Sequence, residues 1–398
     1  MRYNWPEVKL SELCSYRQER VAVDELTVEN YISTANMLPN KGGIEPTESL
    51  PSSSTANRYY AGDVLISNIR PYFKKAWYAT TDGGCSSDVL VLRAKGDVHP
   101  EFLYYLLTSD TFFSYMTATS KGTKMPRGDK QAIMNWRARK PPLPTQRAIA
   151  DTLSCLDAKI ALNKRINENL EEQAQAIFKS WFVDFEPFHD GEFVDSVIGP
   201  IPKGWKACAV TDVIDVNPKR KLDKGTSAKY LSMANVSTSG PRVLGWEQRN
   251  FTSGTCFMNG DVLLARITPS LEHGKTAFVD FLADQEVGWG STEFIVMRSR
   301  EPLPLEYTYC LAKHEPFREH MIKSMTGTSG RQRAQVDALK HYFLAIAPKD
   351  VYAEFQEIVI PFFLAIRRNA TENQVLAALR DTLLPKLMSG EIEVPVVY

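Results

Sequence analysis

The chain has 398 residues, of which 43% are hydrophobic and 24% charged, and its 47 basic residues balance its 47 acidic ones. This length allows two or three domains with sizeable cores, whereas the balanced charge excludes a uniformly basic nucleic-acid coat and leaves only local patches. The apolar runs are shorter than the roughly 20 residues of a membrane span, and the first residues lack the apolar core of a signal peptide. We therefore expect a cytoplasmic protein without a membrane partner.

The six cysteines are scattered along the chain and form no Cys-x-x-Cys pair. A disulfide framework or a structural zinc site would need closer spacing. We expect reduced, buried thiols and no metal site.

Residues 1–142 and 205–348 both combine short β-like runs with short helical patterns. Segments of the first stretch recur in the second in the same order, at an offset that drifts from 198 (position 62 to 260) to 205 (position 122 to 327). Such ordered self-similarity indicates a duplicated domain. The matching segments are Gly62-Asp-Val-Leu-Ile66 with Gly260-Asp-Val-Leu-Leu264, Ser87-Asp-Val-Leu-Val-Leu-Arg93 with Thr292-Glu-Phe-Ile-Val-Met-Arg298, and Gly122-Thr123 with Gly327-Thr328.

A long helical pattern follows each domain. Apolar residues that recur with a heptad rhythm predict two spacer helices with a coiled-coil seam. We expect these helices over 143–186 and 349–390, with a linker at 187–204 and a C-terminal tail at 391–398. The predicted seam residues are Ile149, Leu153, Leu156, Ile160, Asn163, Asn167, Leu170, Ile177, Val359, Phe363, Ile366, Asn373, Leu376 and Leu383.

Asn163 and Asn373 fall at equivalent positions of the two seams. A polar residue in an apolar seam costs stability but fixes register and partner. The alternative is that Asn163 faces solvent on a curved helix. Pro361 lies near the first turns of the second helix, which leaves the N-terminal boundary of that helix open.

Positive charge is concentrated locally, because seven basic residues between Ser120 and Lys140 stand against a single acid, Asp129. Corresponding loops of both domains carry side chains suited to DNA. Arginine recognises guanine edges and Asn or Gln recognises adenine, lysine contacts phosphate, and glycine allows close backbone approach. The alternative is a set of solvated basic loops. The DNA-binding candidates are Asn68, Arg70, Lys74, Lys75, Lys121, Gly122, Thr123, Lys124, Arg127, Arg266, Lys275, Gly327, Thr328, Arg331, Gln332 and Arg333.

Two motifs that resemble enzyme signatures fail on spacing. Gly274-Lys-Thr276 looks like the end of a phosphate loop, but Pro269 stands where the first glycine is required. The pair His314-Glu315 is followed by His320, which is the wrong spacing for a zinc protease helix. The sequence also shows no glycine-rich turn for a methyl donor and no Asn/Asp-Pro-Pro-Tyr/Phe segment. We therefore predict no catalytic residue.

Several segments resemble the specificity subunit of Type I restriction–modification enzymes, and the resemblance covers essentially the whole chain. Only the entry to the second helix, Pro348-Lys-Asp-Val-Tyr352, departs from the family's proline-rich pattern. The segments that carry the resemblance are Pro142-Leu-Pro-Thr-Gln146 with Ile149-Ala-Asp-Thr-Leu153, Asn167-Glu-Asn-Leu-Glu-Glu-Gln173 with Ala176-Ile-Phe-Lys-Ser-Trp-Phe-Val-Asp-Phe185, Ile201-Pro-Lys-Gly-Trp205, and Leu379-Arg-Asp-Thr-Leu-Leu-Pro-Lys-Leu-Met-Ser-Gly-Glu391.

The resemblance implies an α+β fold: two mixed α/β target-recognition domains separated by two long antiparallel coiled-coil helices, with a pseudo-two-fold internal repeat. It implies that the chain is a non-catalytic subunit that binds double-stranded DNA at an asymmetric, bipartite target. The implied partners are two methyltransferase subunits that modify adenine and restriction/translocase subunits that cleave DNA. S-adenosylmethionine, ATP and Mg²⁺ would belong to those partners, and the target adenine would be flipped into a methyltransferase pocket.

Two other classes of function stay open from the sequence. One is a DNA methyltransferase or nuclease fused to recognition domains, which binding of a methyl donor by the purified chain would reveal. The other is a coiled-coil assembly protein without DNA binding, which a binding assay on random duplex would reveal. The missing enzyme motifs speak against the first, and the paired basic loops speak against the second.

Overall fold

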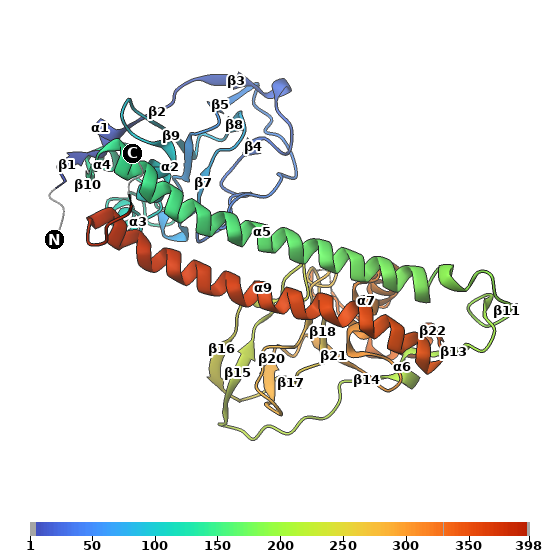
Figure 1. The fold of residues 1–398 in the computed structure, drawn as a ribbon. Coiled ribbons are helices and arrows are strands. Elements are labelled where there is room, and N and C mark those ends of the chain that lie inside the picture. The colour runs from blue at the N-terminus through green and yellow to red at the C-terminus, as the bar shows by residue number, and fades with distance from the viewer. Residues whose placement is uncertain (1–4, 329, 396–398) are drawn as a thin grey trace. The chain divides into compact units, whose positions relative to one another are not determined.

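The computed structural model describes residues 5–328 and 330–395, and the chain divides into two compact units. Unit 1 comprises residues 1–160 and 375–398, and unit 2 comprises residues 161–374. Each unit joins a mixed domain to part of two long helices, α5 (Leu143–Phe182) and α9 (Lys349–Ser389) (Figure 1). Residues 1–4 and 396–398, at the outer ends of the predicted first domain and C-terminal tail, lie outside the described residues.

The described strands of unit 1 form one two-stranded and two four-stranded sheets. The two-stranded sheet pairs β1 (Glu7–Lys9) with β10 (Arg137–Arg139). The first four-stranded sheet has the order β2 (Cys14–Tyr16), β9 (Val89–Ala94), β6 (Val64–Ser67), β7 (Ala76–Tyr78). The second has the order β3 (Arg20–Ala22), β5 (Thr55–Tyr59), β8 (Gly83–Cys85), β4 (Tyr31–Ile32). The domain's helices are α1 (Leu10–Leu13), α2 (Pro100–Leu107), α3 (Asp110–Ala118), α4 (Lys130–Asn135) and the 3₁₀ turns η1 (Val23–Glu25) and η2 (Pro71–Phe73).

Unit 2 repeats this arrangement and adds a small hairpin, β11 (Phe193–Val194) with β12 (Ile201–Pro202). Its two-stranded sheet pairs β13 (Lys206–Ala209) with β22 (Phe343–Ile346). The first four-stranded sheet has the order β14 (Ile214–Val216), β21 (Phe294–Ser299), β18 (Val262–Ala265), β19 (Thr276–Phe278). The second has the order β16 (Glu247–Asn250), β15 (Ser227–Leu231), β20 (Gly288–Gly290), β17 (Thr255–Phe257). The helices are α6 (Val210–Val213), α7 (Leu305–Lys313), α8 (Glu315–Lys323), η3 (Glu186–Phe188), η4 (Met233–Asn235) and η5 (Val336–His341).

The second four-stranded sheets share three strands and differ in the fourth. In both units one strand pairs in parallel with the central strand from a tyrosine onward, with Tyr31 beside Gly84 and Tyr230 beside Trp289. Strands β5, β8 and β4 therefore correspond to β17, β20 and β15. The fourth strand of unit 1, β3, lies on β5, whereas the fourth strand of unit 2, β16, lies on β15. The duplicated domains have thus extended opposite edges of the same three-stranded core.

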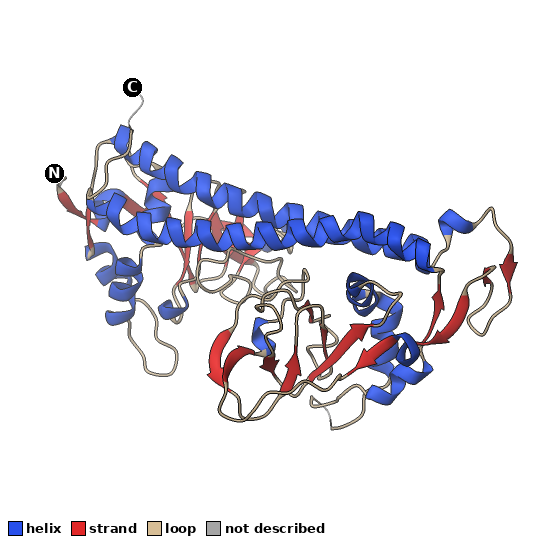
Figure 2. Cartoon of the chain, turned by 60° about the horizontal axis from the view of Figure 1, so that its bottom comes forward, coloured by secondary structure: helices blue, strands red, loops and turns tan. Residues whose placement is uncertain are grey.

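Figure 2 shows the long helices together with the strands and short helices of the domains, and in each unit side chains of the long helices complete the core of the domain. Ile149 and Leu153 of α5 and Leu387 of α9 are at most 1% exposed and belong to the core cluster of unit 1. In unit 2, Phe178 of α5 and Phe355 of α9 are buried in the same way. This burial of one apolar face stabilises helices whose surface residues alone would give only marginal helicity.

The helix ends differ in part from those expected. Helix α5 ends at Phe182 rather than at residue 186, and Phe185 follows it with a left-handed backbone (φ 57°). Helix α9 begins at Lys349 and continues through Pro361 without a break. Gly390 follows its last residue with a φ of 71°, a conformation that glycine adopts without a steric penalty. No helix among the described residues combines the length and apolarity needed to cross a membrane.

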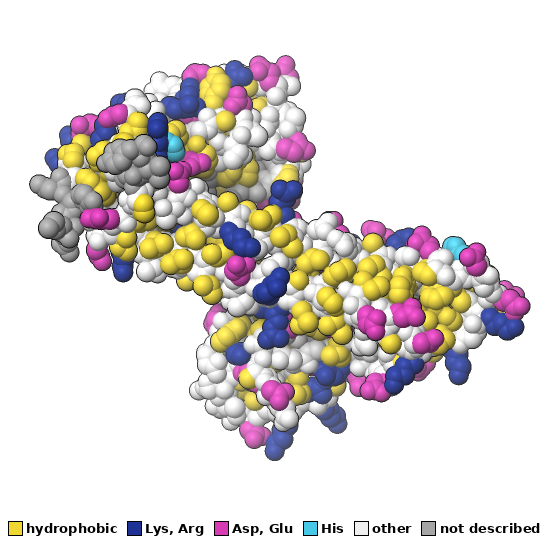
Figure 3. Space-filling view, viewed as in Figure 1, with side chains coloured by type: hydrophobic (Ala, Val, Ile, Leu, Met, Phe, Trp, Pro, Cys, Tyr) yellow, Lys and Arg dark blue, Asp and Glu magenta, His cyan; other side chains and the backbone are white. Residues whose placement is uncertain are grey.

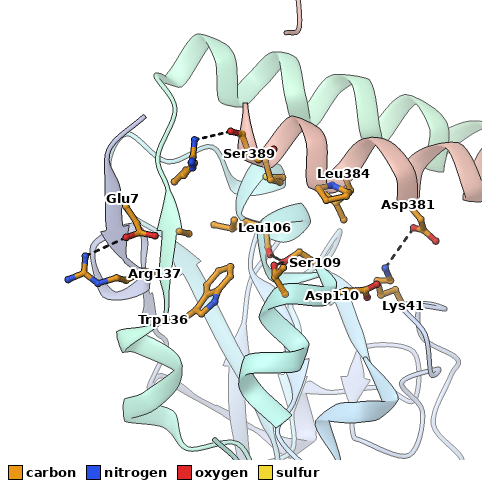
Figure 4. Close-up of a pocket in the computed structure, with 15 residues that line it drawn as sticks. Glu7, Lys41, Leu106, Ser109, Asp110, Trp136, Arg137, Asp381, Leu384 and Ser389 are labelled. Carbon is orange, nitrogen blue, oxygen red and sulfur yellow. Dashed lines mark hydrogen bonds and ion pairs between the residues drawn. The ribbon is translucent and has the colours of Figure 1, made fainter. Parts of the chain in front are cut away.

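A cavity of about 350 Å³ lies in unit 1 between α9 and the domain (Figure 4). Leu106, Trp136 and Leu384 contribute apolar walls. Its charged side chains include the ion pair of Lys41 with Asp381, whose Nζ and Oδ1 are 3.8 Å apart. The cavity is therefore an incompletely filled contact between the helix and the domain.

Candidate nucleic-acid interface

The aspartate of the first Gly-Asp-Val-Leu motif, Asp63, is completely buried. Its carboxylate accepts hydrogen bonds from Nε of Arg17 at 3.0 Å, from Nε of Arg93 and from the backbone N–H of Tyr60 at 2.8 Å. The bond to Asp63 raises the pKa of the Arg93 guanidinium. Burial of a carboxylate requires such partners, and here they fix the start of β6.

Asp261 of the second motif is buried in the same way. It is 3.0 Å from Arg220 and 2.7 Å from Arg298, and it accepts the backbone N–H of Met258 at 2.8 Å. The repeated aspartate is therefore structural in both units. It fixes strands β6 and β18, whose C-terminal ends lead into the loops predicted to bind DNA.

The Gly122-Thr123 loop of unit 1 is closed by its own backbone. Lys121 and Arg127 exchange N–H···O=C hydrogen bonds of 2.8 and 2.9 Å. Arg127 also bridges to Ile69 beyond the end of β6, and its guanidinium is 3.1 Å from Asp88, just before β9. Gly122 has a φ of 95°, which favours glycine at this position. The loop is thereby anchored to the ends of two neighbouring strands.

The loop of unit 2 has the same construction. Thr326 and Arg333 exchange backbone hydrogen bonds, and Arg333 bridges to Ile267 beyond β18. The Arg333 guanidinium lies 2.7 Å from Glu293, just before β21, and this carboxylate raises the pKa of Arg333. Gly327 has a φ of 129°, and a Cβ there would lie 3.0 Å from the carbonyl oxygen of Arg331. The loop geometry therefore requires glycine.

In both loops, some basic side chains have a carboxylate partner and others have none among the described residues. Lys121 is 80% exposed but pairs with Asp129, and its hydrogen bond lowers the pKa of that carboxyl. Lys124 and Arg331 are exposed and have no ion pair among the described residues. Surface ion pairs are weak, so a phosphate can replace the carboxylate partners of Lys121, Arg127 and Arg333. Thr123 and Thr328 are also exposed, and Gln332 is half-buried.

Three predicted lysines are used inside the protein. The ammonium group of Lys75 donates to the carbonyl oxygen of Thr34 at 2.7 Å, and that of Lys275 donates to Met233 at 2.9 Å. Both lysines are half-buried, and burial lowers the pKa of Lys75. Lys74 pairs with an aspartate, Asp110, at 2.7 Å. Hydrogen bonds within the domain thus already engage one donor of Lys75 and one of Lys275, and their contact with phosphate stays a prediction.

Asn68 and Arg266 occupy corresponding places with different exposure. Asn68 is only 7% exposed and its Oδ1 has no hydrogen-bond partner among the described atoms, and its contact with a base stays a prediction. Arg266 is half-buried and lines a cleft of about 280 Å³ together with Arg220 and Thr255. Its Nε is buried and has no hydrogen-bond partner among the described atoms. Arg266 therefore keeps hydrogen-bonding capacity for a ligand.

Within unit 2 the two long helices run antiparallel, because Asn163 lies opposite Asn373 and Asn167 lies opposite Asn369. Asn163 is completely buried, so it does not face solvent. Its side-chain amide donates to Asn373 at 2.9 Å and to Glu372 at 2.7 Å. Of the other predicted seam residues, those that are buried are Ile149, Leu153, Val359, Phe363 and Ile366, and those that are half-buried are Leu156, Ile160, Asn167, Leu170, Ile177, Asn373, Leu376 and Leu383.

Sequence reasoning missed the carboxylates that hold the loops, Asp88 and Glu293. Both stand second in the repeated segment that begins at Ser87 or Thr292. Their shared acidic character at one repeat position was the available signal. Among the described residues, no cluster of three or more His, Cys, Asp or Glu side chains could hold a metal ion.

Comparison with known proteins shows which proteins this chain resembles. A family model described as the Type I restriction modification DNA specificity domain matches residues 3–172. The specificity subunit of the Type I restriction enzyme HindI from Haemophilus influenzae is 24% identical and aligns with 98% of this chain and 100% of that protein. The chain is therefore similar to Type I specificity subunits over almost its whole length, and its residues 3–172 match their specificity domain. The MjaIX specificity subunit of Methanocaldococcus jannaschii is 26% identical over 75% of this chain and 71% of its own length.

The fold class is confirmed by a solved structure. A crystal structure of the S subunit of a Type I restriction–modification system from M. genitalium superimposes on this chain with a TM-score of 0.57. The match is 14% identical and covers 97% of this chain and 96% of that one. The predicted α+β fold of two mixed domains with long helices is therefore confirmed.

Proposed function

We propose that this chain acts in the cytoplasm as the specificity subunit, the non-catalytic DNA-recognition component, of a Type I restriction–modification complex. The observation that carries the proposal is the duplicated loop, in which Arg127 or Arg333 is anchored by a carboxylate beside the free cation Lys124 or Arg331. Two equally built loops on two copies of one fold suit two DNA contacts by a single chain.

The two loops differ in the side chains that they present. Unit 1 offers Lys124, a phosphate-binding residue, whereas unit 2 offers Arg331 and Gln332, which suit base edges. Arg266 adds a guanidinium in unit 2 where unit 1 has the buried Asn68. The domains at 1–142 and 205–348 would therefore read different bases, and the target would be asymmetric and bipartite.

We further propose that two methyltransferase subunits and restriction/translocase subunits assemble on this chain and supply the S-adenosylmethionine, ATP and Mg²⁺ sites. On the face seen in Figure 3, apolar side chains gather along the long helices. In unit 2 these helices carry Leu162 and Leu364, which are 51% and 57% exposed. Exposed apolar patches of this kind mark protein–protein contacts, which supports the helices as the docking surface for the partners.

Methylome sequencing of a host with and without this gene tests the function. We expect methylated adenines within a motif of two defined parts separated by an unspecified gap, and we expect these marks to disappear with the gene. The purified chain alone should transfer no methyl group. Methylation by the pure chain, or an unchanged methylome, would contradict the proposal.

Exchange of residues 205–348 for the same domain of a relative tests the division of labour. We expect one part of the motif to change and the other to stay, since the contributions of well-separated sites are independent. The matched control is exchange of residues 1–142, which should alter the other part. A change of both parts by either exchange would show that the domains do not read separately.

A further inference from the structure

The turn between β6 and β7 has an unusual backbone. It is the 3₁₀ turn η2, and the residues at both of its ends, Arg70 and Lys74, have left-handed backbones with φ values of 49° and 50°. Left-handed geometry is unfavourable for residues with a Cβ, and such strained positions concentrate at functional sites. The strained backbone therefore suggests that the side chains of this turn contact a ligand.

A second strained segment holds this turn in place. Asn40 and Lys41 also have positive φ values, 55° and 61°. The N–H of Asn40 donates to the carbonyl oxygen of Phe73 at 2.8 Å, and that of Lys41 donates to Lys74 at 2.9 Å. The Lys41 side chain points to Asp381 of α9 within unit 1 (Figure 4). The turn is thus held from its backbone, which leaves its side chains free to project.

The side chains that the turn presents are large and apolar. Tyr72 is 49% exposed and Phe73 is 39% exposed, and their ring centroids are 4.7 Å apart. Met125, on the Gly122-Thr123 loop, is 48% exposed and lines a small cleft together with Phe73 and Arg70. Tyr72, Phe73 and Met125 form one exposed apolar surface beside the loop predicted to bind DNA, and we call this surface the aromatic tip.

The charges around the aromatic tip favour an anionic partner. Arg70 and Lys124 have no ion pair among the described residues. The neighbouring carboxylates Asp88, Asp110 and Asp129 are each paired with a basic side chain. An apolar surface with unpaired cations at its rim suits a nucleic acid, whose bases meet the apolar groups while its phosphates meet the cations.

The aromatic tip belongs to unit 1 alone. The corresponding turn of unit 2 runs Pro269-Ser270-Leu271, and Leu271 is completely buried. Ser270 stands in the place of Tyr72. Whatever the tip contacts is therefore contacted by one recognition domain only.

We propose that Tyr72 and Phe73, with Met125, contact bases in the half of the DNA target that unit 1 reads. Aromatic and thioether groups contact thymine methyl groups or wedge between base steps, and both contacts depend on sequence. The inference rests on the proposed function, since it names the residues by which the recognition domain of unit 1 would read its half of the target.

The test compares the double variant Tyr72→Ala/Phe73→Ala with the wild type in the full-length chain assembled with its methyltransferase partners. Binding to the duplex defined by the methylome is measured by fluorescence anisotropy at several salt concentrations. We expect about 10- to 100-fold weaker binding and an unchanged log–log salt slope, because apolar contacts release no counterions. Discrimination against base changes should fall only in the half read by unit 1. Val197→Ala, at a residue that is 76% exposed, is the matched control and should bind like the wild type.

Three results would overturn the inference: unchanged affinity and specificity, a shallower salt slope, or an equal loss of discrimination in both halves. Weakened assembly with the methyltransferase subunits at unchanged DNA binding would also overturn it and would make the tip a protein contact. Thermal unfolding of the variant checks that the fold is intact. If the wild-type complex binds no duplex at all, the proposed function fails, and that outcome is distinct from failure of the tip.

Discussion

The side-chain amide of Asn163 in α5 donates a hydrogen bond to Oδ1 of Asn373 in α9 at 2.9 Å, and both residues belong to unit 2. Replacement of one partner leaves a buried polar group without its hydrogen bond, whereas replacement of both removes the demand. Asn163→Leu should therefore lower the free energy of unfolding by about 1–3 kcal/mol. The double variant Asn163→Leu/Asn373→Leu should recover only part of this loss, because the bond from Asn163 to Glu372 is lost in both variants.

Denaturant unfolding of the full-length chain measures these differences. Leu162→Ala is the control, because this neighbouring residue is 51% exposed and its replacement should change stability by less than about 0.5 kcal/mol. Equal losses in the single and double variants would show that the pair contributes nothing specific. Antiparallel register would then rest on the apolar seam alone.

Lys124→Ala should reduce the log–log salt slope of DNA binding by about 0.9, since it removes one phosphate contact. The measurement is equilibrium binding to cognate duplex between about 50 and 200 mM salt. Lys75→Met is the contrasting variant, because its ammonium group is bonded to Thr34 within the domain. A drop in slope for Lys75→Met would show that Lys75 contacts phosphate as well.

Asp63→Asn should lower the free energy of unfolding of unit 1 by about 3 kcal/mol. This value is at the low end of the cost of breaking a buried ion pair, because Arg17 and Arg93 keep some contact with solvent. Asp261→Asn should do the same in unit 2. Asp24→Asn, at an exposed position, is the control. Amide hydrogen exchange resolves the effect by unit, and equal loss of protection in both units from either variant would contradict independent folding of the two domains.

Mild acid should destabilise unit 2 through His314. This imidazole is half-buried with its ring centroid 5.9 Å from that of Phe178, and burial lowers its pKa. The unfolded chain then binds more protons than the folded one as pH falls through the ordinary histidine value of about 6.5. The contribution of the neutral His314 to the free energy of unfolding is therefore fully present above that pH and decreases as the pH falls below it. Between pH 7.5 and 5.5, Tm should fall less for His314→Gln than for the wild type, while the exposed His341→Gln should match the wild type.

The duplicated domain, the long helices and the family could be predicted because repeats, heptads and helix-ending glycines are local patterns. The burial of Lys75 and Asn68 could not be predicted because it is decided by segments far away in sequence: Lys75 donates to the carbonyl oxygen of Thr34, and Asn68 packs against Gly128. The aromatic tip could not be predicted either, since the left-handed backbones of Arg70 and Lys74 leave no trace in composition. Tyr31-Ile-Ser-Thr-Ala-Asn36 and Tyr230-Leu-Ser-Met-Ala-Asn235 were a further repeat that sequence reasoning could have used.

The opposite placement of β3 and β16 constrains how the two halves of the gene can recombine. Strand β3 precedes β4 in the chain, whereas β16 follows β15, the counterpart of β4. A crossover at the matching positions Ile32 and Leu231 would give one hybrid domain that encodes both extra strands and a reciprocal one that encodes neither. The first would have a five-stranded sheet with both edges extended, and the second would have only the three-stranded core. Unequal exchange within a single gene would thus change the architecture of a recognition domain in one event, without altering a single codon.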